Sequence, residues 1–282
     1  MKTPQIIKTI ILLFAPPTLY KKIVFDSISK MSWKDLQNEE RELLLLKYLL
    51  KKDSIFFDIG ANIGVYAYQA HTMIDEANIY AFEPLPKLYR RLKRSFKKVH
   101  IFQLAISNAS ENQVSFKIPI VRSRELRTRA TLLTSYRETH ETSSRIIQVK
   151  TQTLDDFVGE KSIHTIDLIK IDVEGFEFEV IQGAENSINK FAPILQIEIE
   201  QRHHHYPITE NFAHLKARNY TCCFLNPRSN QMEILEQNPC DLQKAEDFKT
   251  PNYINNFYFF PNEKFNGQML ESINRDIRAL MS

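Results

Sequence analysis

The sequence predicts an α/β fold, in which one open and mostly parallel sheet carries helices on both faces and follows a helical N-terminal extension. The first supporting observation is that short apolar runs alternate with longer segments of mixed polarity. Such alternation is typical of parallel strands joined by right-handed crossover helices. The second is the absence of any internal repeat or low-complexity linker, which indicates one continuous domain. The apolar runs cover residues 55–59, 77–83, 100–106, 167–173 and 193–199.

Length, charge and cysteine content narrow the class of protein. At 282 residues and 33.1 kDa, with 43% hydrophobic residues, the chain has enough apolar surface for an ample core. The net charge of +3 gives no strong argument for nucleic acid, so we expect no nucleic-acid partner. Three cysteines leave an odd thiol and form no C-x-x-C pair. They favour a reducing compartment, and we expect a cytoplasmic protein.

The N-terminal segment, residues 5–25, is apolar and flanked by lysines. Its uncharged run from Thr9 to Tyr20 is shorter than the about 20 apolar residues that cross a bilayer. The favoured interpretation is a helix that packs on the domain or on a second copy in a homodimer. The alternative is a peripheral contact with the inner face of an anionic membrane.

The first elements surround a tight turn. A helix is expected over residues 36–51, and the buried run at 55–59 leads through Gly60 and Gly64 into a helix near Val65. After the second apolar run, a helix between residues 87 and 98 is rich in lysine and arginine, which we interpret as a solvated outer face.

The end of the chain departs from the strand–helix alternation. Tyr220–Leu225 and Tyr253–Phe260 both have strand character without a clear helix before the last one, so an antiparallel pair is expected to close the sheet. We therefore divide the chain into a helical extension (1–52), a main domain (53–262) and a helical tail (263–282).

The turn after the first strand has the pattern D-x-G-x-N-x-G. Glycines allow a tight turn and let a ligand approach the backbone without a Cβ in the way. An acidic residue, Glu83, follows Gly60 by 23 residues at the end of the second apolar run, where it can accept hydrogen bonds from both ribose hydroxyls of a nucleoside. Ligands of such sheets bind beyond the carboxyl ends of the strands, so the two signals predict a nucleoside cofactor there.

The turn distinguishes between nucleoside cofactors. A dinucleotide fingerprint keeps a glycine where this chain has Asn62, because the backbone must approach a pyrophosphate closely. NAD, and with it an oxidoreductase, is therefore disfavoured. S-adenosylmethionine has no phosphate, and backbone donors for its carboxylate together with Asp58 as an acceptor for its ammonium group suit it better.

At these motifs the chain resembles the FkbM family of S-adenosylmethionine-dependent methyltransferases. The resemblance covers residues 53 to 200, and its most specific piece is IDVEGFE, residues 171–177. It implies a Rossmann-like class I methyltransferase fold with a seven-stranded, mostly parallel sheet and an antiparallel C-terminal strand. It also implies O-methyl transfer to a hydroxyl of a small molecule, sugar or glycan. The alternative is a nucleoside-cofactor-binding module that has lost catalysis and serves as a partner or sensor.

The resemblance also implies positions for the cofactor. The turn would hold the methionine end, Glu83 the ribose, the segment from Ala105 to Ser107 the adenine, and the end of the fourth strand the region of the sulfonium. The implied cofactor-binding residues are Asp58, Gly60, Asn62, Gly64, Glu83, Pro84, Ala105, Ile106, Ser107, Asp172 and Glu174.

Methyl transfer to an alcohol also needs a group that removes the proton. The candidates are Asp172, Glu198 and His203, the last from a histidine run whose rings cannot all meet at one point. No spacing demands a metal, so none is expected. Arginines between residues 122 and 129 either form a surface loop, the favoured interpretation, or close over the site and hold an acidic group of the acceptor.

Overall fold

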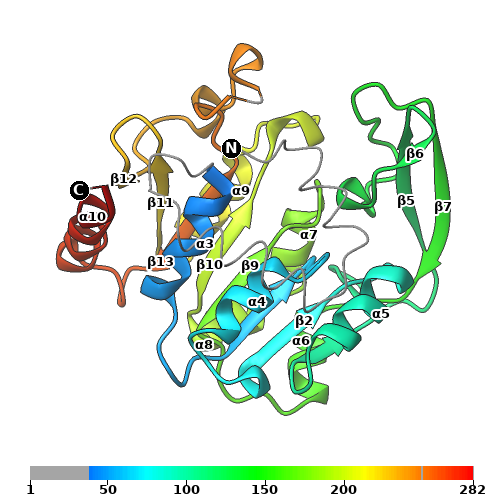
Figure 1. The fold of residues 1–282 in the computed structure, drawn as a ribbon, viewed down its shortest axis with the longest axis horizontal. Helices are drawn as coiled ribbons and strands as arrows, with labels where there is room; N and C mark the ends of the chain where they lie inside the picture. The colour runs from blue at the N-terminus through cyan, green and yellow to red at the C-terminus, as the bar shows by residue number, and fades with distance from the viewer. Residues whose placement is uncertain (1–37, 249, 282) are drawn as a thin grey trace, which may run out of the picture.

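The computed structural model describes residues 38–248 and 250–281, and its centre is a mixed sheet of eight strands (Figure 1). Along the sheet the order is β12-β11-β13-β10-β9-β1-β2-β3. The strands are β1 (Phe56–Ile59), β2 (Ile79–Phe82), β3 (His100–Phe102), β9 (Leu168–Ile171), β10 (Ile194–Glu198), β11 (Tyr220–Asn226), β12 (Gln231–Ile234) and β13 (Asn256–Pro261).

The predicted parallel core and its antiparallel C-terminal strand are confirmed. Strands β3, β2, β1, β9 and β10 pair in parallel, while β13 is antiparallel to both β10 and β11. The prediction of seven strands is wrong, because β12 pairs with β11 as an additional edge strand. This strand is only four residues long, and its burial depends on α10 (Gly267–Met281), which contacts it from elsewhere in the chain. Its sequence therefore gave no distinct strand signal.

Helices cover both faces of the sheet, as predicted. Successive side chains of a strand point to opposite faces. Accordingly, Phe56 and Leu168 belong to one apolar cluster, whereas Phe57 and Ile169 belong to another. The first cluster includes residues of α3 (Asn38–Leu49), α4 (Val65–His71), α5 (Pro86–Ser95) and α10. The second includes residues of α6 (Leu154–Glu160), α7 (Glu177–Gln182), α8 (Glu185–Phe191) and α9 (Thr209–Lys216).

A small antiparallel sheet is inserted between β4 (Ala105–Ile106) and β8 (Thr151–Gln152). It consists of β5 (Val114–Val121), β6 (Arg124–Glu125) and β7 (Ser143–Val149), with β5 in the middle. Figure 1 shows it on the side of the molecule opposite α10. A short 3₁₀ helix, η3 (Arg127–Arg129), follows β6. This insertion places the predicted arginine-rich segment beside the carboxyl ends of the main strands.

Both ends of the described chain pack into the main core. The helix predicted over residues 36–51 is confirmed as α3 from Asn38 to Leu49. The leucines of α3 belong to the same apolar cluster as Ile273 and Ile277 of α10. The apolar segment at 5–25 lies outside the described residues. No helix in the described ranges is long and apolar enough to cross a bilayer. The division at residues 52 and 262 stays a proposal.

Candidate functional site

The turn between β1 and α4 packs directly on the end of β9. Gly60 has φ +81°, and a Cβ atom there would lie 1.8 Å from the carbonyl oxygen of Asp172. Asn62 also adopts a left-handed conformation, with φ 52°. Only a residue without a Cβ fits at Gly60, because the obstacle is backbone and cannot move aside. Gly64, with φ +85°, serves packing instead, since a Cβ there would meet Leu92 of α5 at 2.5 Å.

Glu83 ties this turn to the end of β2. Its Oε2 accepts a hydrogen bond from the Asn62 amide at 2.9 Å, and its Oε1 accepts one from the Leu85 amide at 2.8 Å. The side chain is buried, and burial raises the pKa of Glu83 to about 7 despite these two amides. Each oxygen keeps a second lone pair for a hydroxyl donor.

A cleft of about 560 Å³, partly open to solvent, lies at these strand ends. It brings together most of the residues predicted to bind the cofactor. These are Gly60, Asn62, Glu83, Pro84, Ala105, Ile106, Asp172 and Glu174. The opposite wall comes from the insertion and carries no strand-end signal in the sequence, so only its arginine was anticipated, as the alternative in which the arginine segment closes over the site. Its residues are Phe116, Arg127, Thr128, Ala130 and Leu132.

Three predicted cofactor residues lie outside this cleft. Gly64 packs against α5, as described above. Ser107 donates its amide hydrogen to the Gln152 carbonyl, and its own carbonyl faces Gly183. Asp58 is buried beneath the turn, where its Oδ2 accepts from the Ala67 amide at 3.2 Å. These residues support the turn and its surroundings rather than line the hollow.

Asp172 lines the cleft, where its carboxylate forms an ion pair with the buried Lys170 of β9. Lys170 Nζ lies 2.8 Å from Asp172 Oδ2 and 4.4 Å from the centre of the Tyr66 ring. Burial raises the pKa of Asp58 to about 6, although Lys170 opposes that rise. A lysine in the middle of an apolar strand could have been recognised in the sequence as a functional signal, since such residues are rarely buried without a partner.

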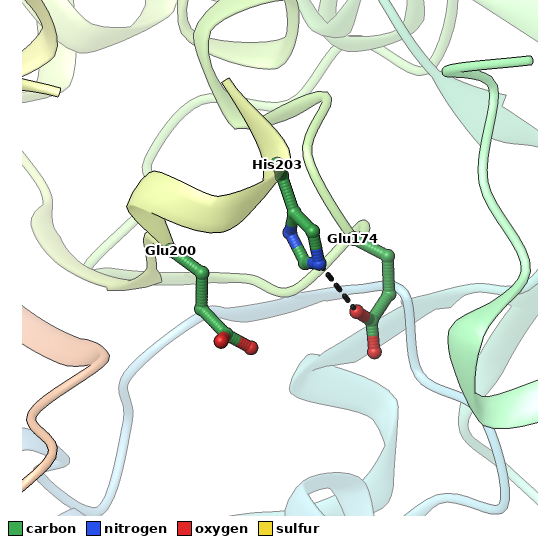
Figure 2. Close-up of side chains that lie close together, drawn as sticks. All are labelled: Glu174, Glu200 and His203. Atoms are coloured by element: carbon green, nitrogen blue, oxygen red, sulfur yellow. Dashed lines mark ion pairs between the residues drawn. The ribbon is translucent and has the colours of Figure 1, made fainter. Parts of the chain in front are cut away.

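Glu174, Glu200 and His203 form a second polar group, the Glu–Glu–His cluster, next to the cleft (Figure 2). One ligand-type atom from each lies within 4.8 Å of the others. Figure 2 shows the His203 ring directed at Glu174, and its Nε2 is 3.7 Å from Glu174 Oε2. The residue types match those that bind divalent cations.

Two arginines already supply positive charge to this cluster. Arg129 Nη1 lies 2.9 Å from Glu174 Oε2 and 3.2 Å from Glu200 Oε1, so it bridges the two carboxylates. Arg202 donates two hydrogen bonds to the Glu200 carboxylate, at 2.5 and 2.9 Å. The favoured surface-loop interpretation of the arginine segment is therefore wrong for Arg127 and Arg129, whereas Arg122 and Arg124 are exposed.

The three members of the cluster have different proton affinities. Burial raises the pKa of Glu174 to about 8, and the charge of Arg129 opposes this only in part. Burial has the same tendency at Glu200, but the hydrogen bonds and charge of Arg202 outweigh it and lower its pKa to about 2. Burial and Arg202 lower the pKa of His203 to about 4, so the ring is neutral at pH 7.

The remaining candidates for proton removal are dispersed. Glu198 does not line the cleft; its Oε1 accepts a hydrogen bond from Asn255 at 2.7 Å, and burial raises its pKa well above the usual range. The histidine run diverges as expected: His203 faces Glu174, His204 lies 3.7 Å from Glu177, and His205 is exposed.

Comparisons with known proteins show the family that this chain resembles. The family described as "Methyltransferase FkbM domain" matches residues 58–222. The hexuronic acid methyltransferase AglP of Haloferax volcanii is 28% identical over 160 residues, which cover 55% of this chain and 60% of AglP. The 2-O-methyltransferase NoeI of Sinorhizobium fredii is 28% identical over 160 residues, covering 52% and 63%. The chain thus spans less than two thirds of these relatives.

Among solved structures, the chain was compared with that of the methyltransferase FkbM from Methylobacillus flagellatus KT. It aligns with a TM-score of 0.45 and 14% identity, over 75% of this chain and 44% of the other.

Proposed function

The chain belongs to the FkbM methyltransferase family, and from this premise we propose that it transfers a methyl group from S-adenosylmethionine to a hydroxyl oxygen of a small molecule, sugar or glycan. The observation that carries this proposal is the cleft at the ends of β1, β2 and β9, where the nucleoside-binding turn, Glu83 and Asp172 meet. The relative named for hexuronic acid supports a sugar acid as the acceptor, and the relative named as a 2-O-methyltransferase supports transfer to an oxygen.

The residues of the cleft fit this cofactor. Asn62 lines the cleft, and its buried Oδ1 has no hydrogen-bond partner in the described chain, so it is available to an ammonium or hydroxyl donor. Glu83 has free lone pairs for the ribose, and Ala105 and Ile106 offer an apolar surface to the adenine. When bound, S-adenosylmethionine supplies a methyl carbon activated by the positive sulfur. Asp172, beside the turn, is placed to meet either the cofactor or the acceptor.

The acceptor hydroxyl must lose its proton as the new bond forms. We assign this step to Glu174, because it lines the cleft and its pKa of about 8 makes it a stronger base than an ordinary carboxylate. Arg129 fixes the position of its Oε2. His203 borders Glu174 and, with a pKa of about 4, serves to position the carboxylate. Glu198 faces Asn255 instead, which removes the reason to keep it as the base.

Calorimetric titration with S-adenosylhomocysteine, and separately with NAD, tests the cofactor. We expect saturable binding of S-adenosylhomocysteine alone, weakened about tenfold or more by Glu83→Ala. Glu83→Gln is the control for folding, because it keeps the size of the side chain, and thermal unfolding of both variants is measured alongside. Binding of NAD instead, or of neither ligand, contradicts the proposal.

The acceptor is tested separately with labelled S-adenosylmethionine and a panel of hydroxylated sugars and metabolites. Methyl transfer to an oxygen is the expected result. Binding of the cofactor without transfer to any acceptor would favour the alternative of a module that has lost catalysis.

A further inference from the structure

A second hollow, which we call the basic groove, lies between α5 and the inserted sheet. It has a volume of about 650 Å³, partly open to solvent. Its apolar lining consists of Leu85, Pro86 and Ile147, and its charged or polar lining consists of Lys87, Arg90, Arg127, Arg145 and Gln148. The solvated helix face predicted at Lys87 and Arg90 is confirmed, since both are exposed. The fold also places them beside two arginines that are far away along the chain.

The basic groove has more positive than negative charge. Glu125 is bound by both Arg127, at 2.6 Å, and Arg145, at 2.7 Å. Within the described residues, neither Lys87 nor Arg90 forms an ion pair. The groove therefore has four positively charged side chains in its lining and one carboxylate, that of Glu125, beside them. Cations gathered in a hollow without matching acids are typical of sites for anions with several charged oxygens.

The basic groove adjoins the cleft at the strand ends, because the two hollows share part of their lining. Leu85 and Arg127 line both hollows. Arg127 and Arg129 begin and end the same 3₁₀ helix, so they are separated by about 4 Å along its axis. Arg129 reaches Glu174, while Arg127 borders the groove. A molecule that occupies the cleft near Glu174 can thus extend past η3 into the groove.

We propose that the basic groove binds a phosphate or diphosphate carried by the methyl acceptor, away from the hydroxyl that is methylated. The acceptor class is then a phosphorylated sugar or glycan precursor. This inference rests on the proposed function, since it assigns the groove to the acceptor of that reaction. A multiply charged phosphate group balances the excess of three positive charges better than a single carboxylate does.

Binding of inorganic pyrophosphate, measured by calorimetry at constant ionic strength, tests the groove directly. The variant is Lys87→Ala/Arg90→Ala. The matched control, Lys93→Ala/Arg94→Ala, removes the same charges from the same helix at exposed positions that do not line the groove. We expect the groove variant to weaken pyrophosphate binding at least about tenfold, and the control to change it less than about twofold.

The same proteins are titrated with S-adenosylhomocysteine to separate the two proposals. Equal cofactor affinity in all three is expected, because neither pair lines the cofactor cleft. No pyrophosphate binding, or equal weakening by the control pair, overturns the groove assignment and leaves the proposed function intact. Failure to bind S-adenosylhomocysteine overturns the proposed function whatever happens with pyrophosphate.

Four acceptor types identify the anion: a neutral hexose, a hexuronic acid, a hexose 1-phosphate and a nucleoside diphosphate hexose. We expect the phosphorylated acceptors to be preferred, and their KM to rise about tenfold in the groove variant with kcat preserved. A preference for the neutral hexose or the hexuronic acid overturns the assignment. Tighter binding of an RNA oligonucleotide than of pyrophosphate also overturns the assignment, because the groove would then belong to a nucleic-acid partner.

Discussion

The two walls of the cleft at the strand ends hold their charges in different ways. On the wall formed by the ends of β1, β2 and β9, Glu83 is bound by backbone amides and Asp172 by a lysine two positions earlier in the chain. On the wall formed by the insertion, Arg129 reaches carboxylates 45 and 71 residues away in the chain. The first wall is therefore pre-formed by local structure. The second wall depends on how the inserted sheet docks on the main domain. The charge balance around Glu174 depends on the same docking.

The largest expected effect concerns the pre-formed wall. Gly60→Ala introduces a Cβ against the Asp172 carbonyl in a left-handed conformation. We expect S-adenosylhomocysteine binding to weaken about a hundredfold or more, since strain of about 3 kcal/mol corresponds to that ratio. Gly159→Ala in α6 is the control, because nothing lies within 4 Å of the new atom. Calorimetry on both variants is the measurement, and equal affinities would show that the turn does not contact the ligand.

The second test asks which carboxylate removes the proton. Glu174→Gln should lower kcat by about 10², the lower end of the range for loss of a general base, while cofactor affinity is retained, because only the base is lost. Glu198→Gln is the matched control, since Glu198 lies outside the cleft and its carboxylate accepts a hydrogen bond from Asn255. Steady-state kinetics with an acceptor that the enzyme methylates decide between the two carboxylates. A larger loss at Glu198 would restore it as the base.

The third test breaks the docking of the insertion. Arg129→Met leaves Glu174 and Glu200 without their bridging cation. Because Arg129 is 34% exposed, we expect the free energy of unfolding to fall by about 2 kcal/mol rather than by the larger amount typical of a fully buried pair. The double variant Arg129→Met/Glu174→Gln should recover part of this loss. Denaturant unfolding measures both, and an unchanged midpoint for Arg129→Met would mean that the insertion docks without this bridge.

The smallest expected effect is a pH dependence. Glu174 must be deprotonated to act as a base, and its pKa is raised to about 8. The rate should therefore increase about tenfold between pH 7 and pH 8.5 and then level off, because the carboxylate form becomes dominant above the pKa. In Glu174→Gln the residual rate should lose this dependence. A rate that is already constant from pH 6 upward would assign proton removal to a group with a lower pKa.

Most of the strand-end wall was predictable. Strand, turn and helix signals are local, and the carboxyl ends of parallel strands meet at one edge of a sheet whatever the details of packing. Gly60, Glu83 and Asp172 were found in this way. Asp58 was assigned to the ligand as an acceptor for an ammonium group, and Ser107 by the resemblance to the family, but the Asp58 side chain and the Ser107 amide support the turn and its surroundings.

The sequence by itself determined the α/β class, the parallel core with its antiparallel C-terminal strand, the family and the edge of the sheet at which we propose that a nucleoside cofactor binds. Only the tertiary structure decided that β12 extends the sheet, that Arg129 bridges Glu174 and Glu200, and that α5 and the inserted sheet enclose the basic groove. The physical reason is the separation along the chain over which each kind of interaction acts. Periodicity and turn chemistry act over a few residues, whereas the partners of a buried charge are set by packing between segments that are distant in the chain.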